Sequence, residues 1–144
     1  MVAIDIEKQL AELFANIKDK QDEIGEEAIK AAAEVTKEEL IKDTNKLMAQ
    51  NPEREKRRTG KLAKSIKATK ISKDKLTGSY RCKLYFAGYG RTGKNRVSNA
   101  QKAIALEHGT TKQDATPFIR PSAERSRKLA LEEAKKAVER VLKN

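Results

Sequence analysis

Residues 102–123, KAIALEHGTTKQDATPFIRPSA, decide how this chain is expected to fold. Pro117 and Pro121 fix φ and remove two backbone donors, so we expect neither a helix nor a central strand to run through this pair. Pro121 can still be the first residue of a helix, because its missing N–H would be unpaired there. Phe118 and Ile119 are then held in an extended bridge, and at least one of them is expected to enter the core. The stretch is therefore predicted to be a rigid junction between a small sheet and a C-terminal helix.

Residues 4–49 are predicted to be helical, because apolar residues recur at steps of three and four. They are Ile6, Leu10, Leu13, Ile17, Ile24, Ala28, Ala31 and Val35. We expect a bend or break near Gly25, and a rotated face or a second helix beyond Val35. So long a helix is hard to bury against a small domain, so part of it is expected to meet another subunit. The alternative is a helical hairpin that turns at Gly25.

The middle of the chain is predicted to form a small antiparallel sheet. Residues 61–66 suit a short helix, and residues 66–72 and 79–87 are the candidate strands. Apolar and polar side chains alternate in residues 80–86, the period-2 pattern of a half-exposed strand. A turn that contains glycine, at residues 73–78, joins the two strands into a hairpin.

The remaining segments complete an α+β fold. Residues 88–96 are expected to be a mobile, glycine-rich basic loop, residues 97–106 a short helix or an extended return, and residues 106–110 a third strand. The final helix is expected to turn inward Ala123, Arg127, Ala130, Leu131, Ala134, Val138 and Leu142. We therefore predict a small antiparallel sheet packed with a C-terminal helix. A long N-terminal helical region (1–52) precedes this α+β core domain (53–144), and the two form a single domain overall.

Charge is distributed unevenly along the chain. The 144 residues carry a net charge of +11, but residues 1–53 carry −6, residues 54–106 carry +14 and residues 107–144 carry +3. A basic middle segment favours a polyanion or an acidic protein surface. The candidate basic surface consists of Arg57, Arg58, Lys61, Lys64, Arg91, Lys94 and Arg96. An alternative function is that of a basic nucleic-acid-binding protein without sequence specificity, since no DNA- or RNA-recognition motif is present.

Catalytic, cofactor and metal sites are not expected. His108 is the only histidine, and its neighbour Glu107 would point elsewhere. Cys82 is a single cysteine, expected to be a buried thiol without a disulfide. Residues 88–93 have the spacing G-x-G-x-x-G, but the helix that a dinucleotide-binding loop must open is not predicted after them. We expect no signal peptide, no contact with a membrane, and a place inside the cell or in an assembly built there.

Three short motifs follow one another at defined spacings. They are Thr59-Gly60-x-Leu62-x-x-Ser65, Glu107-x-Gly109-Thr110 and Pro117-Phe118-Ile119-Arg120-Pro121. In this respect residues 55–144 resemble the neck and tail-completion proteins of lambda-like long-tailed bacteriophages. His108, and the small residues around Ala103, stand where that family usually has aromatic residues.

The resemblance implies a structural virion protein that acts at the head–tail junction without catalysis. It also implies assembly as a homo-oligomeric ring, with phage neck and tail proteins as partners. Non-specific contact with packaged DNA would suit the basic segment. Such a protein would occupy the host cytoplasm during assembly and the virion afterwards.

Overall fold

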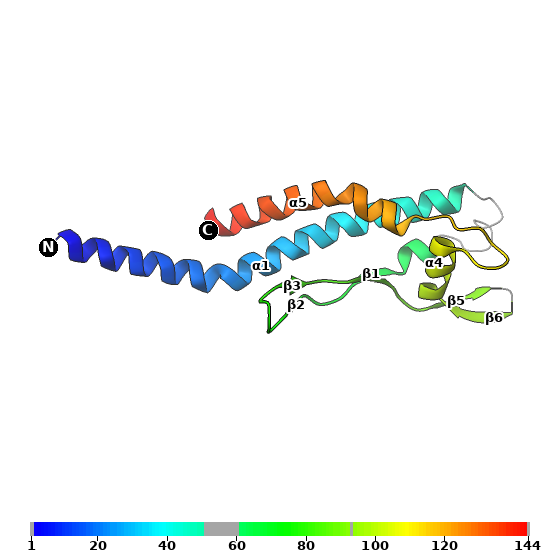
Figure 1. The fold of residues 1–144 in the computed structure, drawn as a ribbon, viewed down its shortest axis with the longest axis horizontal. Helices are drawn as coiled ribbons and strands as arrows, with labels where there is room; N and C mark the ends of the chain where they lie inside the picture. The colour runs from blue at the N-terminus through cyan, green and yellow to red at the C-terminus, as the bar shows by residue number, and fades with distance from the viewer. Residues whose placement is uncertain (1, 51–60, 93, 144) are drawn as a thin grey trace.

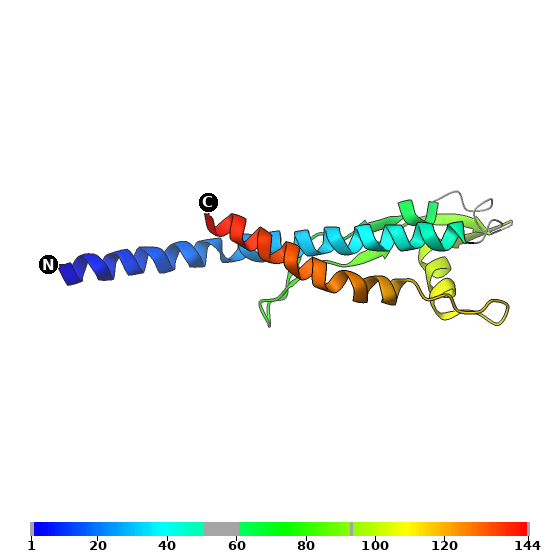
Figure 2. The same ribbon diagram turned by 90° about the horizontal axis from the view of Figure 1, so that it is seen from above.

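The computed structural model describes residues 2–50, 61–92 and 94–143. Its frame is a pair of long helices, α1 (Val2–Ala49) and α5 (Ile119–Lys143), which lie side by side along an elongated molecule (Figure 1). The two helices run in opposite directions, and the N-terminal part of α1 extends well beyond the end of α5 in both views (Figures 1 and 2). The predicted α+β class, with a long N-terminal helix, small antiparallel sheets and a C-terminal helix, is confirmed.

The first helix is continuous, so the alternative of a helical hairpin that turns at Gly25 is wrong. The helix also runs on through Val35 to Ala49, where a second helix had been an option. Its axis changes direction in its middle part (Figure 1). A Cβ at Gly25 would overlap the ring of Tyr80, so glycine at this position lets strand β3 (Tyr80–Arg81) approach the helix closely.

The predicted hairpin is present as a ribbon of short strands beside α1. Strand β1 (Ile66–Ala68) pairs antiparallel with β4 (Leu84–Phe86), and β2 (Ser72–Lys73) pairs with β3 (Tyr80–Arg81). Ile66 lies opposite Phe86, and Gly78, with φ +71°, closes the turn. The short helix α3 (Lys61–Lys64) leads into the ribbon, as predicted.

The alternation of residues 80–86 is confirmed: the even-numbered residues are half-buried and the odd-numbered ones are exposed. Cys82 is only half-buried, however, so the prediction of a buried thiol is corrected. The residue lies where the ladder is interrupted between β3 and β4, and its thiol donates to the carbonyl oxygen of Thr69 at 3.3 Å.

Two segments between the ribbon and the proline pair differ from the prediction. The expected mobile loop is a β-hairpin of β5 (Tyr89–Thr92) and β6 (Asn95–Ser98). The third strand expected at 106–110 is absent from this place: residues 106–108 are the end of helix α4 (Asn99–His108), and Thr110 forms only an isolated bridge with Gln113. The hydroxyl of Ser98 accepts the N–H of Gln101 at 3.1 Å, and this N-cap starts the helix directly after β6.

The hydrophobic core lies at the C-terminal end of α1, where α3, α4 and the start of α5 converge. Its buried residues are Leu40, Leu47, Met48, Leu62, Ile66, Ala103, Leu106 and Phe118. The first half of α1 contributes none of these residues. No helix in the described part of the chain is long and apolar enough to span a membrane.

The inner face of α5 is rotated from the predicted one. Of the predicted inward residues, Ala130 is buried and Ala134 and Val138 are half-buried, but Ala123, Arg127, Leu131 and Leu142 are exposed. The buried residues of the helix are Ser122, Ser126, Ala130, Ala137 and Val141. Small side chains let the two helix backbones approach closely, so a seam of serine and alanine packs against α1 and the leucines lie beside it.

Candidate functional site

The three motifs meet in space around the start of α5. Leu62 of the first motif, Leu106 beside the second and Phe118 of the third belong to one buried cluster, and each is at most 4% exposed. Phe118 also contacts the ring of Phe86 edge-to-face, with ring centroids 6.1 Å apart. The motifs therefore build one junction that joins α3, the ribbon, α4 and α5.

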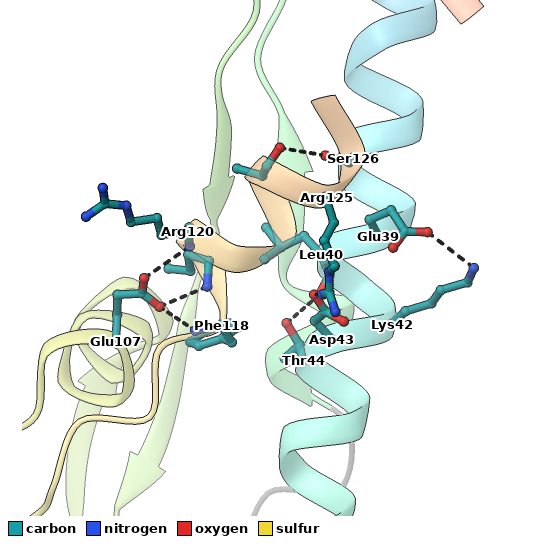
Figure 3. Close-up of polar contacts among 12 residues, drawn as sticks. Glu39, Leu40, Lys42, Asp43, Thr44, Glu107, Phe118, Arg120, Arg125 and Ser126 are labelled. Atoms are coloured by element: carbon teal, nitrogen blue, oxygen red, sulfur yellow. Dashed lines mark hydrogen bonds and ion pairs between the residues drawn. The ribbon is translucent and has the colours of Figure 1, made fainter. Parts of the chain in front are cut away.

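Glu107 is the polar centre of this junction. Its carboxylate accepts the backbone N–H groups of Phe118 at 2.7 Å, Ile119 at 2.8 Å and Arg120 at 3.1 Å (Figure 3). The first N–H groups of a helix have no partner within the helix, and a carboxylate at this end also interacts favourably with the helix dipole. The second motif thus caps the helix that the third motif begins.

The backbone donors at the start of α5 are fully accounted for. Glu107 takes those of residues 118–120, Pro121 has none, and the N–H of Ser122 donates to the carbonyl oxygen of Phe118 at 3.2 Å. The helix begins at Ile119, between the two prolines, so it does not run through the pair. Pro121 is the third residue of the helix and not the first, and Ile119 is helical and not part of an extended bridge. Proline is tolerated in a first helical turn because its N–H is not needed there.

The electrostatics of Glu107 follow from these contacts. Partial burial raises the pKa of its carboxyl, but the three backbone hydrogen bonds and the nearby His108 lower it, and the net pKa lies below its usual value. The carboxylate is thus stabilised in its charged form, as a helix cap requires. This arrangement positions a helix; it does not hold a reactive group.

Gly109 and Thr110 turn the chain after α4. Gly109 has φ +78°, and a Cβ on it would lie 2.8 Å from the backbone nitrogen of Ala115, so only glycine fits. Its N–H donates to the carbonyl oxygen of Ala105, and Thr110 forms a bridge with Gln113. The Glu-x-Gly-Thr motif is therefore a helix terminus and a turn that aim Glu107 at α5.

The other motif residues have different environments. The buried Ser65 donates its hydroxyl to the carbonyl oxygen of Leu62 at 2.6 Å, and its own carbonyl accepts the N–H of Ala87 at 2.8 Å, which ties α3 to the end of β4. Pro117, Pro121 and Arg120 are exposed, and Arg120 pairs with Glu124 one turn later. Thr59 and Gly60 lie outside the described residues.

The candidate basic surface falls on separate elements. Arg57 and Arg58 lie outside the described residues, Lys61 and the exposed Lys64 belong to α3, and Arg91, Lys94 and Arg96 belong to the hairpin of β5 and β6. In that hairpin Arg91 and Arg96 occupy opposite register positions.

The aromatic residue of this hairpin is also accessible. The guanidinium of Arg96 lies 4.4 Å from the ring centroid of Tyr89, whose side chain is 65% exposed. An arginine over an accessible ring can bind both a phosphate group and a flat apolar surface. The hairpin is therefore a second candidate site, separate from the Glu107 junction.

Two polar contacts that the sequence did not predict hold α1 in place. Asp22 accepts hydrogen bonds from Lys73, at 2.8 Å, and from the hydroxyl of Tyr80, so it links α1 to the ribbon. The hydrogen bond from Lys73 is the main cause of the lowered pKa of Asp22. Arg125 forms an ion pair with Asp43, which links α5 to α1 near the core (Figure 3).

The grooves formed by the described residues are not lined by a recognisable catalytic arrangement. One groove, of about 510 Å³, lies between α1 and the ribbon and is lined by residues that include Lys30, Lys37, Ala68, Ile71 and Cys82. The described residues contain no group of three or more His, Cys, Asp or Glu side chains that could hold a metal ion. His108 is exposed in the last turn of α4.

A family model described as "Bacteriophage HK97-gp10, putative tail-component" matches residues 8–109. The match spans most of α1, the ribbon, the hairpin of β5 and β6, and α4, and it ends at Gly109 of the second motif. Comparisons with curated proteins and with solved structures gave no match.

Proposed function

The chain belongs to the HK97 gp10-like family of bacteriophage tail components, and we propose that this structural tail protein acts where the tail joins the head. It does so as a ring of copies that contacts neck and tail proteins, without catalysis. The family match carries the proposal, because it covers the long helix and most of the α+β core together. The capped junction supports the proposal, because Glu107 and the core give the subunit a rigid shape. A protein that connects two larger assemblies needs such rigidity.

The location can be tested by labelling phage particles. Leu76 is 96% exposed at the tip of the ribbon, so an epitope inserted between Leu76 and Thr77 leaves the core intact. We expect antibody-bound gold to mark one end of the tail, next to the capsid, in particles that remain infectious. Label along the whole tail, or complete particles without any label, would overturn a role at the junction.

Contact with DNA is a second candidate function, supported by the charge of the ribbon and the hairpin. Residues 75–106 contain seven basic and no acidic residues. Replacing Lys94 and Arg96 by Glu should weaken binding to unrelated duplex DNA and lower its salt dependence by about two phosphate contacts. The matched control, Lys112→Glu with Lys128→Glu, makes the same change of net charge at exposed sites elsewhere.

The same titration separates the two functions. Tight, salt-dependent binding by the isolated monomer indicates a nucleic-acid-binding protein. Weak binding by the monomer, together with ring-shaped oligomers or capture of tail proteins, supports the role at the head–tail junction.

A further inference from the structure

In the N-terminal arm of α1, residues 2–18, the described apolar side chains are open to solvent. Leu10 is 46% exposed and Ile17, seven residues later, is 49% exposed. Every residue between 8 and 18 whose exposure the structure describes is exposed. Figures 1 and 2 agree that this end of α1 extends beyond the other elements.

The exposed stripe of the arm is one end of a longer apolar stripe on α1, and α5 covers the rest of it. Further along α1 the same three- and four-residue steps lead to Ile24, Ala28, Ala31 and Val35, all half-buried where the two helices run side by side. With 25 residues against 48, α5 can cover only about half the length of α1. A stripe that continues past its covering helix indicates that a further helix covers the remainder.

A second apolar stripe lies uncovered on α5, beside the seam of small residues. Leu131 is 56% exposed, Leu142 is 53% exposed, and the half-buried Val138 lies between them on the same side of the helix. The arm points away from the end of α5, so the two stripes cannot meet within one molecule (Figures 1 and 2). They are available to meet between molecules.

The two stripes also have opposite charge around them. Residues 2–27 contain eight acidic and three basic side chains, and Asp5, Glu12, Asp19 and Glu26 recur every seventh residue. Residues 127–143 of α5 contain six basic and three acidic side chains. Attraction of this kind favours association of unlike surfaces over association of like ones.

We propose that the arm of one copy docks on the stripe Leu131–Val138–Leu142 of α5 in a second copy. Each copy then donates one arm and accepts one, so the contact is head-to-tail and can close into a ring. The inference rests on the proposed ring assembly and names the two surfaces that build it.

Paired substitutions test each surface. Leu10→Gln with Ile17→Gln changes the arm, Leu131→Gln with Leu142→Gln changes α5, and Leu76→Gln at the ribbon tip is the control. Glutamine forms helices well, so circular dichroism should show unchanged helix content. We expect each pair to raise the dissociation constant for self-association at least tenfold, by sedimentation velocity, and the control to leave it unchanged.

Mixing the two defective proteins gives the decisive result. The arm variant keeps an intact α5 and the α5 variant keeps an intact arm, so one good contact can form between them and none beyond it. We expect each variant alone to be monomeric and an equimolar mixture to form a heterodimer that grows no further, by native mass spectrometry. Raising the salt concentration should weaken that dimer, because exposed charges are screened.

Three outcomes would overturn the proposal: unchanged self-association in either variant, a mixture that stays monomeric, or a wild-type chain that stays monomeric at millimolar concentration. None of them bears on whether the protein sits at the head–tail junction, which gold labelling of particles decides separately. A correctly labelled particle whose protein fails the mixing test keeps the junction role and loses the arm contact.

Discussion

Replacing Glu107 by Gln tests whether the second motif works as a helix cap. The substitution preserves size and leaves the core residues Leu106 and Phe118 untouched. One carboxylate oxygen accepts two N–H groups and the other accepts one. An amide has a single oxygen, so in its best orientation it keeps the bonds from Phe118 and Ile119 and turns its own NH₂ group toward the N–H of Arg120.

The expected loss of stability follows from the two interactions that the amide of glutamine cannot make. One hydrogen bond to a charged acceptor is lost, at about 1.5–3 kcal/mol, and the interaction with the helix dipole, at about 0.3–1 kcal/mol, disappears. Because the site is partly solvated, we expect a loss of about 2 kcal/mol in the free energy of unfolding. For a chain of this length that corresponds to a decrease of about 6 °C in Tm.

The pH dependence of the stability difference separates the effect of the Glu107 charge from an effect of packing. The pKa of Glu107 is lowered in the folded state, so its contribution to stability is complete above the unfolded value of about 4.3 and is lost as the pH falls through the lower folded value. Urea unfolding of both proteins from pH 7 to pH 3 should therefore give curves that converge in acid. Glu132→Gln, at an exposed position of α5, is the matched control and should follow the wild type throughout.

Two results would refute the reasoning. One is a stability difference below about 0.5 kcal/mol at pH 7, within the range of ordinary surface substitutions. The other is a difference of constant size down to pH 3, which would mean that the charge of Glu107 contributes nothing and that the substitution acts through packing alone.

Three further predictions concern packing. Gly25→Ala should destabilise the chain, because the added methyl group overlaps the Tyr80 ring. In a Tyr80→Ala background the same substitution should instead stabilise the chain by about 1 kcal/mol, because alanine forms helices better than glycine. Thermal unfolding of the double-mutant cycle measures both effects. Phe118→Ala should cost about 3–5 kcal/mol in urea unfolding, because the ring is 4% exposed within the core. Ser126→Leu should cost about 1–3 kcal/mol by overpacking the seam, and an unchanged Tm would show that α1 and α5 can move apart freely.

Local patterns predicted the parts of the fold in which one residue's role depends on near neighbours. The alternation around Leu84 and the helical steps of α1 are periodicities among residues close in the sequence, so period alone identified the ribbon and the long helix. The prediction that Phe118 or Ile119 enters the core held because two prolines limit the backbone between them. None of these inferences required knowledge of what lies on the other side of the core.

Predictions failed where distant segments decide the outcome. The inner face of α5 was misplaced because a close approach to α1 selects Ser122 and Ser126, which a search for apolar residues passes over. Residues 106–110 suit a strand locally, yet the cap at Ser98 starts a helix that continues to His108. The role of Glu107 was missed because its partners lie beyond a loop. An acidic residue twelve positions before a helix start that lies between two prolines is the signal that could have pointed to it.

The exposed arm has a consequence for how this family varies. Residues 8–18 are under little constraint from the fold of their own subunit, so their identities depend chiefly on what they touch in the particle. If they touch α5 of a neighbour, substitutions at Leu10 and Ile17 should be correlated with those at Leu131 and Leu142 among related phages, while Glu107 and Gly109 stay invariant. Correlated substitutions at positions that do not touch within one subunit would indicate that these positions touch between neighbouring subunits of the particle.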